Sequence, residues 1–209
     1  MGALGLKRRP KRRVCRTTNS QHGFGRYPNL VAGRVAGAPE ETWVSDITYI
    51  RLHHEFIDLA VVMDVFTRTI RGWNLGRSLG QELTLVALER ALVHQHPQIH
   101  HSDQGVQYAA PAYIQALKQA GVAISMAAVG EPRENGYAER LIRTIKAEEV
   151  DLAEYADFED AVMQIGHFID DVYRTKRIHS ALGYPTPAEF EATWRQEQAQ
   201  ASQDSLNSV

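Results

Sequence analysis

Three acidic residues in this sequence have types and spacing that suit joint chemistry. Asp46 lies in an apolar run over 43–51, Asp103 directly follows a strand-length run over 98–102, and Glu139 lies in a helical pattern, with 35 residues between it and Asp103. Carboxylate oxygens suit Mg²⁺, and two such ions can activate a water or a 3′-hydroxyl while stabilising the leaving oxygen of a phosphodiester. The three acids therefore predict a metal-dependent site for phosphodiester chemistry.

Each acid also has an ordinary structural interpretation. An Asp at a strand end commonly caps a turn, and a Glu on a helix is commonly a solvated surface residue. Asp58 and Asp64 are rival carboxylates on the second apolar run, but Asp58 could point to solvent and Asp64 could pair with Arg68. Only the combination of three acids favours the catalytic interpretation.

The elements that must position these acids alternate between strand and helix patterns. Strand-like runs cover 43–51, 55–65, 69–75, 98–102 and 122–126, and helical patterns cover 81–96, 111–120 and 134–150. Short connections make the first three strands antiparallel, whereas strands linked through helices lie parallel. The order βββαβαβα predicts an α/β fold with a mixed five-stranded sheet flanked by helices.

The predicted organisation has four parts. These are a flexible basic arm over 1–40, a catalytic core over 41–150, a helical extension over 151–198 and a disordered tail over 199–209. The extension contains an amphipathic helix over 158–173, expected to pack on the core, and a final helix over 186–198.

The net charge of −2 hides an asymmetry along the chain. Residues 1–40 carry nine Lys or Arg and one acid, whereas the remainder has a net charge of −10. Such an arm suits a polyanion, and Lys11, Arg12 and Arg13 are candidate DNA contacts. A solvated tail without a special role is the alternative.

Composition excludes several classes of protein. No run reaches the roughly 18 apolar residues of a membrane span, and the N-terminus does not read as a secretory signal. The single Cys15 excludes an internal disulfide and a zinc site of the His/Cys kind. The pairs His53-His54 and His100-His101 cannot chelate jointly because adjacent strand residues point to opposite faces. We expect a soluble, cytoplasmic protein.

Five runs, spanning 43–190, carry a family resemblance: WVSDITYI, VVMDVFTRTIRGW, HSDQGVQYAAPAYIQAL, GEPRENGYAERLIRTIKAEEV and RIHSALGYPTPAEF. Together they resemble the integrase core in the second reading frame of IS3-type transposases, relatives of retroviral integrases. The resemblance implies an RNase H-like fold, a DDE triad of Asp46, Asp103 and Glu139, and dependence on two Mg²⁺ or Mn²⁺ ions. It also implies DNA strand cleavage and transfer without a covalent protein intermediate, by a homo-oligomer acting on double-stranded DNA at the bacterial nucleoid.

Other polar residues near the triad are candidates for DNA contact. Arg143 and Lys146 follow Glu139 at i+4 and i+7, so they share its helix face and would lie near phosphates. A surface ion-pair network is the alternative. Three further candidates, which have turn and cap chemistry as an equal alternative, are Gln107, Tyr108 and Asn135. His179 resembles a recurrent family position with a structural or DNA-contacting role.

Some features depart from the family pattern. About 40 residues precede the core, so a helix-turn-helix would come from an upstream-frame partner, or the chain is a truncated remnant. Glu134-Asn135 stands where Asp-Asn is usual, and Ala127-Ala128 where polar and basic residues are commoner. A truncated DNA-binding regulator and an RNase H-like nuclease therefore remain as alternative functions.

Overall fold

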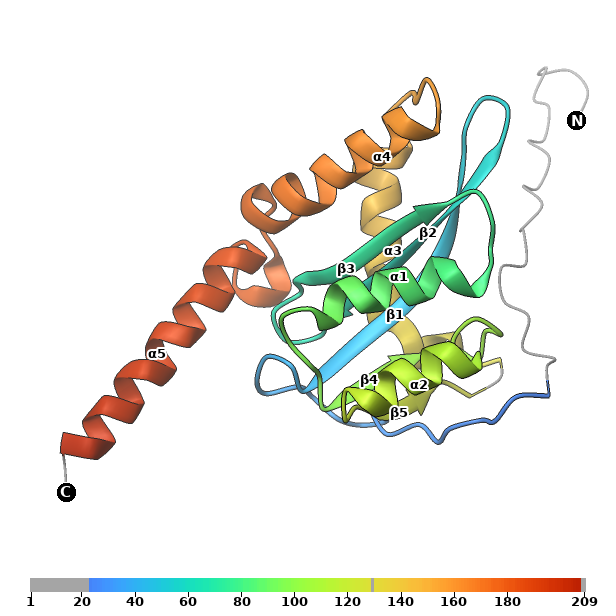
Figure 1. Ribbon diagram of the computed structural model, residues 1–209. Helices are drawn as coiled ribbons and strands as arrows, with labels where there is room; N and C mark the ends of the chain where they lie inside the picture. Colours follow the sequence, from blue (N-terminus) through green and yellow to red (C-terminus); the bar gives the residue numbers. More distant parts are fainter. Residues whose placement is uncertain (1–22, 129, 208–209) are drawn as a thin grey trace, which may run out of the picture.

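The computed structural model describes residues 23–128 and 130–207, a sheet between two layers of helices (Figure 1). The strands are β1 (Thr42–Arg51), β2 (Phe56–Asp64), β3 (Ile70–Gly76), β4 (Ile99–Ser102) and β5 (Ala123–Met126). The α-helices are α1 (Gln81–Leu92), α2 (Pro111–Gln119), α3 (Gly136–Ile145), α4 (Phe158–His167) and α5 (Pro187–Asn207). Shorter helical segments are η1 (Pro132–Asn135), η2 (Lys146–Val150), η3 (Phe168–Lys176) and η4 (Ser180–Leu182). The basic arm residues Lys11, Arg12 and Arg13 lie outside the described residues.

The predicted order βββαβαβα and the mixed five-stranded sheet are confirmed. The helix expected over 134–150 is present as a continuous helical path, with a 3₁₀ turn in η1 and wider π-helical turns in η2. The helix expected over 158–173 also widens into π-helical turns, and it packs on the core as predicted.

Two predicted helix ends are wrong. Helix α1 ends at Leu92 and not at residue 96, because Pro97 disfavours helical backbone at residue 96 and, in a continued helix, its ring would clash with the Val93 carbonyl. Helix α5 continues to Asn207, through residues expected to form a disordered tail. Positions 199–207 contain neither Gly nor Pro, so nothing in them breaks the helix. In the described part of the chain, no helix is both long and apolar enough to cross a membrane.

Strand β1 occupies the centre of the sheet, whose order is β3-β2-β1-β4-β5. It pairs with β2 antiparallel and with β4 parallel, and β4 pairs with β5 parallel. The sheet therefore changes direction at β1. In α/β sheets ligands gather outside the carboxyl ends of parallel strands, which places the expected site beyond the end of β4.

Alternate residues of β1 enter two different cores. Trp43 and Ile47 pack with α1 and α2 on one face, whereas Val44 and Ile50 pack with α3, α4 and η3 on the other. Figure 1 shows α1 and α2 on the opposite side of the sheet from α3. Because side chains alternate along a strand, Asp46 shares the face of Val44 and Ile50. This is the face that α3 covers.

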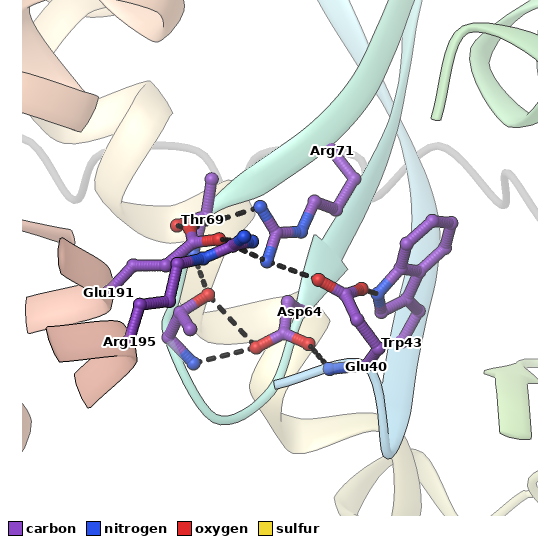
Figure 2. Close-up of polar contacts among 8 residues, drawn as sticks. Glu40, Trp43, Asp64, Thr69, Arg71, Glu191 and Arg195 are labelled. Carbon is purple, nitrogen blue, oxygen red and sulfur yellow. Dashed lines mark hydrogen bonds and ion pairs between the residues drawn. The ribbon is translucent and has the colours of Figure 1, made fainter. Parts of the chain in front are cut away.

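A network of polar contacts fastens α5 to the sheet (Figure 2). The Arg71 guanidinium on β3 pairs with Glu191 of α5 at 3.0 Å and with Glu40 at 2.6 Å. Glu40 also accepts a hydrogen bond from the Trp43 indole at 2.6 Å, and its backbone N–H donates to buried Asp64 at 2.8 Å. The start of β1, the end of β2 and the first turns of α5 are thus held together, while the rest of α5 extends away from the sheet (Figure 1).

The contact between β3 and α1 predicts a strong effect of one methyl group. A Cβ at Gly72 would lie 2.2 Å from the Ala87 carbonyl oxygen and 2.8 Å from the Ala91 nitrogen, both backbone atoms of α1. We expect Gly72→Ala to lower the free energy of unfolding by about 3 kcal/mol or more, because the helix must move away from the sheet. Denaturant unfolding measures this change.

Gly37→Ala is the matched control for that experiment. A Cβ at Gly37 would meet only a Glu41 carboxylate oxygen, at 3.8 Å. Its free energy of unfolding should stay within about 0.5 kcal/mol of the unsubstituted chain. Equal stabilities of the two variants would contradict close packing of α1 on β3.

Candidate active site

The register of β1 and β4 brings two of the three predicted acids together. The parallel ladder pairs Trp43 with His100 and Val44 with His101. Continued by two residues, the same register sets Asp46 opposite Asp103, which is the first residue after β4. The structure therefore brings these two carboxylates together at the carboxyl end of β4.

Helix α3 brings the third acid to the same face of the sheet. Ala138, Leu141 and Ile145 are its buried residues and join the core that contains Val44. Glu139 follows Ala138, is half-buried, and lies near enough to Asp46 to influence its ionisation. Three acids from a central strand, a strand exit and a covering helix thus face one region.

The electrostatics of this region favour a bound cation. Burial first, and then the negative charges of Asp103 and Glu139, raise the pKa of Asp46 from 3.8 to about 7. The backbone N–H of Ile47 and the ammonium of Lys146 act in the opposite direction. A divalent cation bound here would relieve the repulsion that disfavours the ionised form of Asp46.

Backbone groups orient the two facing Asp side chains. The Asp46 carboxylate accepts a hydrogen bond from the Ile47 N–H at 2.8 Å, and Asp103 accepts one from the Gly105 N–H at 2.8 Å. A Cβ at Gly105 would lie 2.9 Å from the Asp103 carboxylate, so the turn after β4 is tight. Across residues 23–128 and 130–207, no three His, Cys, Asp or Glu side chains are close enough to ligate one ion together.

The two predicted cations lie beside these acids in different environments. Arg143 is exposed and lines a surface recess together with Glu139. Lys146 is half-buried, and its ammonium lies 4.4 Å from the centre of the Tyr49 ring. Both positions suit phosphate contact, with Arg143 the more accessible of the two.

Burial contradicts the direct DNA contacts expected of Gln107, Tyr108 and Asn135. Gln107 is 4% exposed and donates to the Leu79 carbonyl at 3.0 Å, which ties the loop after β4 to the entry of α1. Tyr108 is 2% exposed and meets Tyr113 edge to face. The polar character of these residues serves internal packing, which sequence patterns cannot separate from surface exposure.

Asn135 is a positioning residue that the sequence did not identify as one. It is 4% exposed, does not cap α3, and donates its side-chain N–H to the carbonyl of Ser45 at 3.1 Å. Ser45 immediately precedes Asp46, so this bond ties the start of the Glu139 helix to the Asp46 strand. Glu134 closes the preceding loop by accepting the Ala128 N–H at 2.6 Å.

The buried histidines are structural. His100 hydrogen-bonds with Ser45 at 2.7 Å and with Tyr113 at 2.9 Å, and burial lowers its pKa to about 3. His101 hydrogen-bonds with Ser125 at 2.8 Å on the other side of β4. The expectation that neighbouring histidines face opposite ways is confirmed for this pair.

Comparison with known proteins identifies relatives of this chain. Two family models described as an integrase core domain match residues 36–132 and 120–187. The transposase for insertion sequence element IS904 of Lactococcus lactis is 34% identical over 195 residues, covering 91% of this chain and 77% of that protein. Transposase InsF for insertion sequence IS3A of Escherichia coli is 29% identical, covering 90% of this chain and 66% of that protein.

A solved structure has the same fold. The HTLV-2 integrase catalytic core domain in complex with magnesium, in its trimeric form, superposes with a TM-score of 0.60 at 14% identity. The match covers 75% of this chain and 99% of that one. The predicted RNase H-like fold is therefore confirmed.

The raised pKa of Asp46 predicts a pH effect on stability without metal. Between pH 3.8 and about 7 the folded chain keeps a proton on Asp46, whereas the unfolded chain has released it. The free energy of unfolding in EDTA should therefore lose a contribution as pH rises through this window. Asp46→Asn should not show this loss of unfolding free energy. Above the window it should therefore be more stable than the unsubstituted chain. Denaturant unfolding at several pH values measures this, and an unchanged pH dependence in Asp46→Asn would count against the repulsion.

The contact of Asn135 with Ser45 gives a second prediction. Asn135→Ala should lower the free energy of unfolding by about 1–3 kcal/mol, because it removes a buried hydrogen bond and side-chain volume. The affinity of the folded chain for DNA should stay unchanged, as measured by fluorescence anisotropy in EDTA. A large loss of DNA affinity at unchanged stability would instead support a direct contact between Asn135 and DNA.

Proposed function

Because this chain belongs to the IS3-type family of insertion-sequence transposases, we propose that it catalyses metal-dependent cleavage and transfer of DNA strands. Its catalytic residues are Asp46, Asp103 and Glu139. One observation carries this assignment: the β1–β4 register, continued two residues beyond its last pair of Val44 with His101, sets Asp46 opposite Asp103, whose charge acts on Asp46.

The donor set fits a divalent cation with a preference for oxygen ligands. Burial, and then the charges of Asp103 and Glu139, raise the pKa of Asp46, and a divalent cation bound to these carboxylates would offset that repulsion. These residues would hold Mg²⁺ or Mn²⁺, two ions in all. When bound, such ions lower the pKa of an attacking water or 3′-hydroxyl and neutralise charge on the leaving oxygen.

The residues around the acids have separate tasks. Arg143, exposed beside Glu139, binds a phosphate and aligns the strand. Lys146, lodged over Tyr49, adds positive charge near Asp46. Asn135 fixes the start of α3 against β1. A DNA strand positioned against one acid is therefore positioned against all three.

The partners follow from the substrate. We propose that double-stranded DNA is bound both as element end and as target, and that copies of the chain assemble on it as a homo-oligomer. Trimeric and dimeric forms of the HTLV-2 integrase core offer a precedent for self-association of this fold. A helix-turn-helix protein from an upstream reading frame is a further partner for end recognition.

A strand-transfer assay on labelled DNA carrying the element ends tests this function. Glu139→Gln removes one charged ligand with little change of shape, so cleavage and joining should fall by at least about a hundredfold. Glu89→Gln on α1, exposed on the other side of the sheet, is the matched control and should keep full activity.

Other outcomes separate the rival functions. Metal-dependent nicking without joining would favour a nuclease, because hydrolysis needs only one half of the chemistry. No cleavage with DNA binding retained would favour a regulator that competes for DNA. Equal activity in Glu139→Gln and the unsubstituted chain would show that Glu139 is not a catalytic residue.

A further inference from the structure

A second surface cavity, of about 290 Å³, adjoins the recess beside Glu139. We call it the basic groove and define it by six of its lining residues: Arg68, Tyr137, Arg140, Arg177, His179 and Tyr184. They come from the β2–β3 turn, from α3 and from the segment after η3. Arg140 and Thr144 line both the groove and the recess that contains Glu139. The two cavities therefore adjoin each other along α3.

The basic groove has an excess of positive charge. Arg177 is paired with Glu148 at 2.6 Å, but within the described part of the chain neither Arg68 nor Arg140 forms an ion pair with a carboxylate. The Arg68 guanidinium lies 4.3 Å from the centre of the Tyr137 ring, which leaves its charge unneutralised. Burial, followed by Arg177 and Arg68, lowers the pKa of His179 to about 4. The groove is therefore a positive region of surface.

Two exposed aromatic rings lie among these cations. Tyr137 is 44% exposed and Tyr184 is 68% exposed. Tyr184 is held outward by its own segment, in which its N–H donates to the His179 carbonyl at 2.9 Å and the His179 N–H donates to the Pro185 carbonyl at 3.0 Å. Proteins that bind single-stranded nucleic acid combine cations, which contact phosphates, with exposed aromatic rings, on which bases stack.

The backbone of the groove is strained where it presents these side chains. Of the three non-glycine residues with positive φ in the described chain, Arg68 (63°) and Tyr184 (78°) both line the groove. Such conformations cost free energy and are retained where a side chain must take a particular direction. Two of the groove's side chains are therefore carried by backbone in a conformation that favours glycine.

We propose that the basic groove binds the DNA strand that continues from the scissile phosphate, with Arg68 and Arg140 on successive phosphates and Tyr184 stacked on an unpaired base. This inference rests on the proposed function, since it takes the strand to start at the acidic triad. A strand bound there must leave along some surface, and the adjoining surface on α3 is cationic. Phosphates satisfy guanidinium groups in the bidentate manner that such sites favour.

Metal-free DNA binding by the full chain tests the groove. The probe is a short fluorescein-labelled duplex with a single-stranded overhang, titrated in EDTA at several salt concentrations. Arg68→Asn combined with Arg140→Gln should weaken binding by about tenfold or more and reduce the salt slope by about two. Asn tolerates the left-handed backbone at position 68, so the fold should persist.

Two companion variants sharpen the test. Lys118→Gln removes an exposed charge from α2, on the other side of the sheet, and should leave affinity and slope nearly unchanged. Tyr184→Asn should weaken binding to the overhang duplex more than binding to a blunt duplex. Equal losses in Lys118→Gln and the double arginine variant would overturn the proposal. Competition by poly-glutamate as effective as that by DNA would overturn it as well, in favour of an acidic protein partner.

The result separates the groove from the proposed function. Groove-dependent binding in a chain that never cleaves DNA with Mg²⁺ or Mn²⁺ would overturn the catalytic assignment alone. Normal cleavage, with binding unaffected by the groove variants, would overturn the groove alone.

Discussion

The parallel pairing of β1 with β4 is the constraint on which the rest of the site depends. It fixes which residue of the central strand lies opposite the exit of β4, and a slip of one residue would turn the Asp46 side chain to the other core. Buried hydrogen bonds between Ser45, His100 and Tyr113 add to the backbone ladder at the same level. Side chains on the opposite face of the sheet, next to the acids along β1, therefore help to hold the register.

The third acid depends on how α3 is docked. The apolar side of α3 packs into the core that contains Val44, and this packing fixes the position and rotation of the helix on the sheet. The Asn135 bond to Ser45 fixes its first turn along the strand direction. With both constraints, Glu139 faces the other two acids, and Arg140 and Arg143 line the same surface recess beside it. The same helix thus supplies an acidic residue to the site and cations to its surroundings.

Much of this arrangement was predictable from the sequence because it depends on local patterns. The apolar runs specify five strands in the observed order, and the three acids stand out by position and by family resemblance. The parallel register was not predictable, since it depends on packing across the sheet. Residues chosen for polarity alone, Gln107 and Tyr108, are buried, because the sequence does not reveal what covers a loop.

Other features escaped prediction for the same physical reason. Asn135 lies at a helix start, where capping is the usual role, yet its partner is a strand 90 residues away in sequence. Arg68 lies in a turn and was considered only as a partner of Asp64, whose carboxylate instead accepts from Thr67 and from the Glu40 N–H. The left-handed backbone of Arg68 and its contact with Tyr137 emerge only from the assembled fold.

The most direct test of the central claim is a crystal structure of the chain soaked in Mn²⁺, with the ion located by its anomalous scattering. We expect a peak beside the carboxylates of Asp46 and Asp103, which would hold the ion together with Glu139. A peak that lies away from both aspartates, in a crystal whose β1–β4 register is intact, would contradict it.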